Sequence, residues 1–185
     1  MFGWGWGAML LLLSAAILLF FRDPEREPGG GPSAVLSPAD GRVVAVETLE
    51  VGHRLAPEAI QRISIFMSPL DVHVNRAPTD GMVEQVSYHR GKFGAAYKGD
   101  ASDYNENNVL VVRTRSGNRL VIVQIAGWLA RRIVCDVGPG DTLVRGKRFG
   151  LIMFGSRVDL YLPKEVSVKS ELGQRVAAGR SVVAE

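Results

Sequence analysis

The sequence predicts a mainly β domain with a sandwich or barrel-like form, preceded by one N-terminal membrane helix. From Ser37 onward, short runs rich in Val and Ile recur between Gly, Pro, Asp and Asn, which is the pattern of strands separated by turns. No segment after residue 21 has a long apolar repeat of 3.6 residues, so helices there should be short and few. Residues 1–21 carry no charge, and residues 8–21 are almost wholly apolar.

The first 21 residues have the composition of a membrane anchor. About 20 helical residues cover the roughly 30 Å hydrocarbon core of a bilayer. Trp4 and Trp6 suit one membrane interface, and Arg22 and Arg26 flank the other end. A cleaved signal peptide is a rival, but a basic leading region and a small-x-small cleavage site are missing. We expect an uncleaved anchor in the cell membrane, with the next domain facing the cytoplasm; partial insertion of the helix stays open.

The rest of the chain divides into a linker and one domain. Residues 22–36 are rich in Gly and Pro and predict a linker that keeps the domain near the bilayer. Residues 37–185 form the domain, whose size suits a single core. Its expected strands cover residues 42–49, 60–67, 72–76, 81–88, 109–113, 120–126, 132–136, 149–154, 158–162 and 181–184.

A short pattern, Gly-x2-[Leu/Val]-x2-Gly, occurs at residues 140–146 and again at residues 173–179, each time before an apolar strand. Residues 37–46 form another turn-then-strand unit. Such units resemble the barrel-sandwich domains of biotinyl and lipoyl carriers. A carrier needs an exposed lysine at a hairpin tip, and neither Lys147 nor Lys164 has the flanking residues of such a site. A carrier role is therefore disfavoured.

The composition excludes several other classes of function. The single cysteine, Cys135, cannot form an internal disulfide. His53, His73 and His89 are scattered without metal-ligand spacing, so no metal site is expected. The net charge of +3 is mild, and no dense Lys/Arg stripe alternates with aromatics, which disfavours nucleic acid. A slightly basic domain suits an anionic lipid surface.

Four motifs follow one another along the chain. Residues 37–41 read Ser-Pro-Ala-Asp-Gly, and residues 68–73 read Ser-Pro-Leu-Asp-Val-His. A loop at 91–108 ends Tyr-Asn-Glu-Asn-Asn, and residues 154–156 read Phe-Gly-Ser. In this order and spacing, they resemble the short form of the phosphatidylserine decarboxylase family over nearly the whole chain.

The resemblance implies a self-processing enzyme. The precursor would cut itself between Gly155 and Ser156 into chains 1–155 and 156–185, which stay together. Ser156 would become a covalent pyruvoyl cofactor, the electron sink that decarboxylation of an amino acid needs. The enzyme would then convert phosphatidylserine to phosphatidylethanolamine.

The resemblance also assigns roles to individual residues. Ser156 is the expected nucleophile, and a serine hydroxyl needs a base to take its proton. His73 is the expected base, and Asp40 is expected to hold its imidazole ring in the useful tautomer. Arg76 stands where better-known members have a second histidine.

Candidate substrate-binding residues come from the same resemblance and from the loop at 91–108. They are Arg76, His89, Lys92, Phe93 and Tyr97. Glycine, aromatic and lysine residues in that loop suit an interfacial lid over the site.

Two alternatives remain at this point: a pyruvoyl decarboxylase of a soluble amino acid, and a membrane-tethered, non-enzymatic barrel-sandwich adaptor that never cleaves. The expected partners are a phospholipid substrate, the membrane and the two chains of one precursor, with a homo-oligomer left open. The choice between an ester and an ether lipid is also open.

Overall fold

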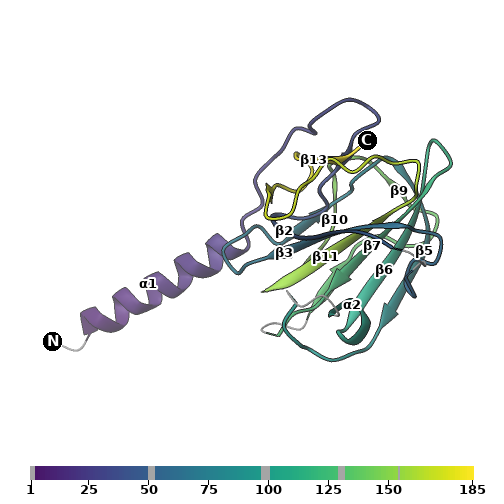
Figure 1. The fold of residues 1–185 in the computed structure, drawn as a ribbon. Coiled ribbons are helices and arrows are strands. Elements are labelled where there is room, and N and C mark those ends of the chain that lie inside the picture. The colour runs from purple at the N-terminus through teal and green to yellow at the C-terminus, as the bar shows by residue number, and fades with distance from the viewer. Residues whose placement is uncertain (1–2, 50–52, 97–100, 129–131, 154) are drawn as a thin grey trace.

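The computed structural model describes residues 3–49, 53–96, 101–128, 132–153 and 155–185, and these residues form a mainly β fold (Figure 1). The described residues contain two helices, α1 (Gly3–Phe20) and α2 (Ala101–Tyr104). Their strands are β1 (Val35–Leu36), β2 (Gly41–Thr48), β3 (Gln61–Met67), β4 (Val74–Arg76), β5 (Gly81–His89), β6 (Asn107–Thr114), β7 (Arg119–Ile125), β8 (Ile133–Cys135), β9 (Thr142–Leu143), β10 (Arg148–Ile152), β11 (Ser156–Leu162), β12 (Arg175–Val176) and β13 (Val182–Ala184).

Eight strands form one antiparallel sheet in the order β12-β2-β3-β11-β7-β6-β5-β9, and Figure 1 shows this sheet strongly twisted and curled. A second sheet of three strands, β4-β10-β8, packs against one face of it, and β1 pairs with β13. The prediction of a mainly β, sandwich or barrel-like domain is confirmed in its broad form.

The main core lies between the large sheet and the three-stranded sheet. Alternate residues of the central strands point into it, including Ile65 and Met67 on β3 and Val158 and Leu160 on β11. A smaller apolar cluster covers the opposite face of the large sheet and includes Tyr161. Because both faces of β11 are covered, all seven of its residues are buried.

The predicted strands coincide with observed strands, with three informative differences. β11 begins at Ser156, two residues earlier than expected, so Ser156 lies within a ladder. β4 begins at Val74, which leaves His73 just before the strand. The two-residue strands β1, β9 and β12 and the short helix α2 were not predicted, because such short elements have no readable periodicity. Residue 154 of the expected strand 149–154 lies outside the described residues.

The glycine pattern found in the sequence forms two matching turns. All four of its glycines have positive φ: 93° at Gly140, 79° at Gly146, 84° at Gly173 and 69° at Gly179. The first turn carries edge strand β9 and the second carries edge strand β12. A Cβ added to Gly179 would lie 3.1 Å from the carbonyl oxygen of Gly146, so the two turns touch. Their contact brings the two edges of the curled sheet together.

The prediction of a membrane-spanning helix at residues 1–21 is not supported. Among the described residues, no helix is both long and apolar enough to cross a bilayer.

The segment 22–36, predicted as a linker, is held closely against the domain. Arg22 donates to the carbonyl oxygen of Leu70 at 2.6 Å, and Arg145 donates to the carbonyl oxygen of Gly31 at 2.6 Å. A Cβ added to Gly29 would lie 2.1 Å from the carbonyl oxygen of Arg180. The end of α1 is therefore fixed relative to the sheet.

Candidate active site

Ser156 is the first residue of β11 and lies opposite Met67, the last residue of β3. Directly paired residues project to the same face of a sheet, so the Ser156 side chain points toward the main core, as Met67 does. Its Oγ is buried and has no hydrogen-bond partner among the described residues. A buried hydroxyl without a partner is costly, and such groups in native proteins call for an explanation.

Gly155 has φ +64°, a backbone conformation that residues with a side chain rarely adopt. Among the described residues, its chain neighbours aside, no heavy atom lies within 4 Å of a Cβ placed there. Glycine is therefore required at this position by the backbone conformation and not by a lack of space.

His73 is buried, and its ring is oriented by the chain itself. Nδ1 lies 2.8 Å from the carbonyl oxygen of Asp71. A carbonyl oxygen can only accept, so Nδ1 carries the proton and Nε2 is the basic nitrogen of the neutral ring. The Phe20 ring packs on the imidazole with 4.3 Å between centroids. Burial lowers the pKa of His73 below its ordinary value of 6.5, despite opposing effects from Asp71. His73 is therefore neutral and able to accept a proton at pH 7.

Asp40 has other partners than the one expected. Its Oδ2 accepts a hydrogen bond from Arg26 Nη2 at 2.8 Å, and its Oδ1 accepts one from the backbone N–H of Ala178 at 2.7 Å. The contact that orients the imidazole comes from the Asp71 carbonyl, not from Asp40. The charge of Asp40 raises the pKa of the His73 ring, by less than Asp71 does. A catalytic role for Asp40 stays a prediction.

The motifs that carry these residues meet at one end of the large sheet. β3 lies between β2 and β11, and a Cβ added to Gly41 would lie 3.3 Å from Met67 Cα, so Asp40 and Ser156 flank the end of β3. The backbone N–H of Ile152 donates to the carbonyl oxygen of His73 at 3.3 Å, four residues before Ser156. Ser156, His73 and Asp40 are thus brought to one region from three separate segments.

Arg76, a predicted substrate-binding residue, is buried and bonded to the chain itself. Its guanidinium donates to Asp23 at 2.7 Å, to the carbonyl oxygen of Pro24 at 2.9 Å and to that of Gly146 at 3.0 Å. These bonds fasten the segment after α1. A role for Arg76 toward substrate stays a prediction.

The other predicted substrate-binding residues lie in or before the loop at 91–108. His89 ends β5, Lys92 is exposed, Phe93 is half-buried, and Tyr97 lies outside the described residues. The loop is joined to the Ser156 end of the sheet, because Asn105 Nδ2 donates to the carbonyl oxygen of Ala126 at 2.9 Å. Whether these residues contact substrate stays a prediction.

Sequence reasoning missed two buried polar groups beside the site. Arg157 and Asp159 form a buried ion pair on the face of β11 opposite Ser156, at 2.8 Å, and Arg157 also donates to the carbonyl oxygen of Ala96 at 3.3 Å. Asn75, Gln124 and Asn108 form a chain of amides on the same face as Ser156. The sequence offered one sign of the amide chain, a glutamine within the otherwise apolar run 120–126.

Comparison with known proteins decides the family. The family model for phosphatidylserine decarboxylase matches residues 13–184, almost the whole chain. The chain belongs to the phosphatidylserine decarboxylase family. The resemblance inferred from the four motifs is therefore confirmed.

Individual members of the phosphatidylserine decarboxylase family match over nearly full length. The phosphatidylserine decarboxylase proenzyme of Desulfotalea psychrophila is 46% identical over 177 residues, which cover 96% of this chain and 82% of that protein. That of Ralstonia nicotianae is 47% identical, covering 99% and 84%, and that of Magnetococcus marinus is 47% identical, covering 92% and 78%. The word proenzyme in these names fits a chain that is processed after synthesis.

Proposed function

We propose that this chain is a proenzyme that cleaves itself between Gly155 and Ser156 and then decarboxylates phosphatidylserine to phosphatidylethanolamine. Membership of the family carries the decarboxylase activity. The observation that best supports Ser156 as the reacting residue is its buried Oγ, which has no partner among the described residues and follows a left-handed glycine.

The self-cleavage that we propose uses groups already in the chain. Nε2 of neutral His73 takes the proton from Ser156 Oγ, which adds to the carbonyl carbon of Gly155. The bond from that carbon to the nitrogen of residue 156 breaks, the nitrogen takes up the proton, and an ester remains. Loss of the Ser156 Cα proton then expels the Gly155 carboxylate and leaves dehydroalanine. Water converts it to a pyruvoyl group and ammonia.

A pyruvoyl group at residue 156 fits its surroundings. Its keto carbonyl would withdraw electrons from the substrate Cα when joined to the substrate amine. The first residue of β11 is buried next to Met67 and close to the polar amides of Asn75 and Gln124. This setting offers polar amide groups beside a largely apolar core. The two chains stay together because β11 pairs with β3 and β7 along its whole length.

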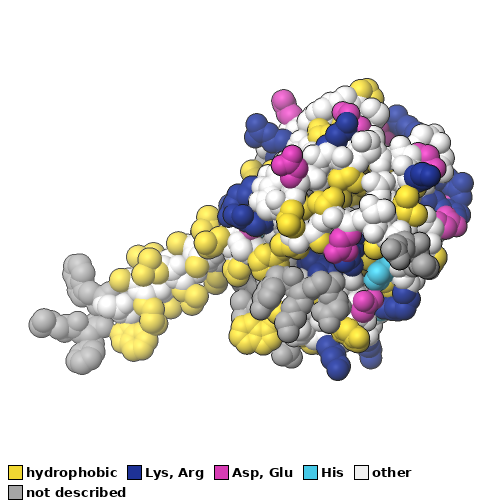
Figure 2. All heavy atoms as spheres, in the orientation of Figure 1, with side chains coloured by type: hydrophobic (Ala, Val, Ile, Leu, Met, Phe, Trp, Pro, Cys, Tyr) yellow, Lys and Arg dark blue, Asp and Glu magenta, His cyan; other side chains and the backbone are white. Residues whose placement is uncertain are grey.

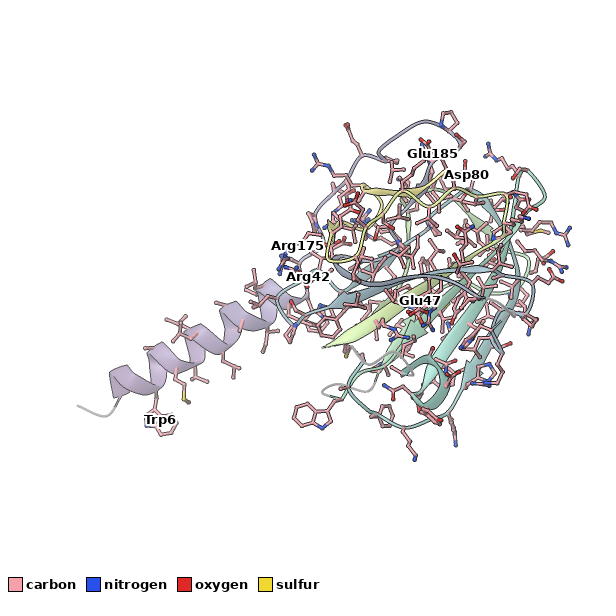
Figure 3. The ribbon with its side chains drawn as sticks, in the orientation of Figure 1. Trp6, Arg42, Glu47, Asp80, Arg175 and Glu185 are labelled. Carbon is pink, nitrogen blue, oxygen red and sulfur yellow. The ribbon has the colours of Figure 1, made fainter. Side chains whose placement is uncertain are left out.

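We further propose that the domain works at a membrane surface, with α1 inserted partway into one leaflet and the domain on the cytoplasmic side. The described part of α1 exposes large apolar side chains, and Figure 2 shows hydrophobic side chains continuing along it to the domain. Phe21 and Leu70 are also more than half exposed near its end. Arg42 and Arg175 lie where α1 joins the domain (Figure 3), which suits anionic lipid.

The intact mass of the purified protein tests the cleavage, with Ser156→Ala as the control. We expect two chains ending at Gly155 and beginning at residue 156, with the smaller chain lacking ammonia and blocked at its N-terminus. Ser156→Ala should remain one chain. A single uncut species from the unaltered sequence would contradict the proposal and favour the non-enzymatic adaptor.

Activity assays separate the remaining alternatives. Processed protein supplied with vesicles of phosphatidylserine should release carbon dioxide, and free serine at the same concentration should not be consumed. Decarboxylation of free serine alone would identify an enzyme of a soluble amino acid. Binding to phosphatidylserine vesicles should weaken in Leu11→Asp, which places a charge on the exposed face of α1.

A further inference from the structure

Three amide side chains form a hydrogen-bonded chain between the two sheets. Asn108 Nδ2 on β6 donates to Gln124 Oε1 on β7 at 3.0 Å, and Gln124 Nε2 donates to Asn75 Oδ1 on β4 at 2.9 Å. All three side chains are at most 2% exposed. Burying an amide costs free energy unless its hydrogen bonds are satisfied. A buried amide with an unsatisfied group therefore suggests a functional role.

The orientation of this chain follows from one backbone group. Gln124 Nε2 also donates to the carbonyl oxygen of Val134 at 3.2 Å, and a carbonyl can only accept. The NH2 group of Gln124 therefore faces Val134 and Asn75. Asn75 must present its oxygen to Gln124, so its own NH2 group points the other way.

The NH2 group of Asn75 is left with a poor acceptor. Among the described residues its partner is Met67 Sδ, at 3.9 Å, and a thioether sulfur is a weak acceptor. Met67 is the residue paired with Ser156, whose Oγ is buried without a partner among the described residues. A nearly unused donor and an unused hydroxyl thus flank the same methionine on the same face of the sheet.

The side chain of Gln124 has little room to move, so the orientation that it imposes on the Asn75 amide is fixed. A Cβ added to Gly150 on β10 would lie 3.1 Å from Gln124 Nε2 and 2.2 Å from the carbonyl oxygen of Val134. The backbone of β10 therefore lies close against the amide chain, with no room for a side chain at Gly150, and Gly150 pairs with Asn75 in the sheet. A donor held this way needs no reorganisation when negative charge develops beside it.

We propose that Asn75 is a further catalytic residue of self-cleavage, whose Nδ2 donates to the oxyanion formed at the Gly155 carbonyl when Ser156 Oγ adds to it. Gln124 and Asn108 are positioning residues that aim this donor. The inference rests on the proposed self-cleavage at Gly155–Ser156. Loss of one donor to such an oxyanion slows acyl transfer by about 100-fold to 1,000-fold in other enzymes.

The test is the rate of self-cleavage of freshly made precursor, followed by intact mass, in Asn75→Asp. Aspartate keeps the oxygen that Gln124 contacts, but when ionised it replaces the NH2 donor by a second oxygen and adds a negative charge that opposes an oxyanion. We expect cleavage at pH 7 to be about 100-fold slower than in the unaltered chain. Asn118→Asp, the same change in the β6–β7 turn at the far end of β7, should cleave at the unaltered rate.

The pH dependence of the cleavage rate distinguishes a role of Asn75 as hydrogen-bond donor from a purely structural role. A protonated aspartic acid regains an O–H donor, and burial raises the pKa of a carboxyl group. The cleavage rate of Asn75→Asp divided by that of Asn75→Ala should therefore rise as the pH falls. Hydroxylamine, which cleaves esters, should release few fragments from Asn75→Asp at pH 7, because ester formation is the step that the change slows.

The outcomes distinguish an error in the role of Asn75 from an error in the proposed self-cleavage. If the unaltered chain cleaves and Asn75→Asp cleaves within about threefold of its rate, the role of Asn75 is wrong and the proposed function stands. A rate ratio that does not change with pH, or a large ester fraction released by hydroxylamine, also overturns it. An unaltered chain that never cleaves overturns both. The thermal unfolding of each variant, measured with Ser156→Ala added to prevent cleavage, shows whether it folds. If Asn75→Asp does not fold, the cleavage rate of Asn75→Ala tests the proposal instead.

Discussion

Asp40 and Asp80 make the same contact in two similar parts of the domain. Each follows a Pro-x pair and precedes a glycine that begins a strand, β2 or β5. Asp40 accepts a hydrogen bond from the N–H of Ala178 at 2.7 Å, and Asp80 accepts one from the N–H of Arg145 at 2.8 Å. In both cases the donor precedes a glycine with positive φ. The motif that resembles a catalytic segment is therefore also a structural turn.

This relationship allows the two roles of Asp40 to be separated. Asp40→Ala and Asp80→Ala should each lower the free energy of unfolding by about 1 kcal/mol or more, since each leaves a backbone N–H without its acceptor. Only Asp40→Ala should slow self-cleavage, by about tenfold or more, because Asp40 acts electrostatically on His73. Melting is measured with Ser156→Ala added and cleavage without it. Equal cleavage rates in both variants would leave Asp40 a turn residue alone.

Gly155 should matter through its backbone. Gly155→Ala should lower the free energy of unfolding of the uncleaved chain by about 1–2 kcal/mol, because alanine is disfavoured at φ +64°. The measurement is denaturant unfolding with Ser156→Ala added. Gly31→Ala is the matched control, since Gly31 also has open space around it but no positive φ. A loss of the same size in both would refute the conformational explanation.

The pH dependence of cleavage should follow His73. Its pKa lies below 6.5 because the ring is buried, so cleavage should be constant above pH 6.5 and fall as the pH drops below it. Stability should change in the same direction. The unfolded chain takes up a proton near pH 6.5 that folded His73 does not, so stability is retained above that pH and lost as the pH falls. A rate that falls already above pH 7 would contradict this assignment.

Phe20 should lower the pKa of His73 by shielding its ring from water. Phe20 is 4% exposed and covers the His73 ring, whereas its neighbour Phe21 is 53% exposed. Phe20→Ala should admit water, reduce the desolvation of the imidazole and shift the cleavage profile to higher pH. Phe21→Ala should leave the midpoint unchanged. The same midpoint in both variants would show that the end of α1 does not form a wall of the site.

Arg76 should hold the segment after α1 in place. Arg76→Ala leaves two buried carbonyl oxygens without their donor and Asp23 with Arg148 as its remaining partner, and should lower the free energy of unfolding by about 3 kcal/mol. Limited proteolysis should then cut within residues 22–32 sooner. Arg115→Ala, which removes an exposed ion pair with Asp80 at 3.6 Å, should change stability by less than about 1 kcal/mol. Unchanged proteolysis in Arg76→Ala would argue for a role at the substrate instead.

Local patterns were enough to find most of the fold. Alternating Val and Ile runs located the long strands, and the glycine pattern at 140–146 and 173–179 located two turns whose glycines all have positive φ. The family could be recognised because its motifs are short and contiguous. Residues 22–36 were harder to read: they have the composition of a linker, yet Arg22, Arg26 and Arg145 bond this segment to the domain, contacts that no local pattern reveals.

The sequence by itself determined the strand content and the order of the four motifs, and it predicted Ser156 as the residue to be converted. Only the tertiary structure decided which groups surround Ser156, because those neighbours come from strands far apart in the chain. It assigned the orientation of His73 to the Asp71 carbonyl and attached Asp40 to Arg26. It also placed the Asn75–Gln124–Asn108 amides on the same buried face. Sequence periodicity shows whether a residue faces a core, but the partner it meets there depends on how the sheets pack.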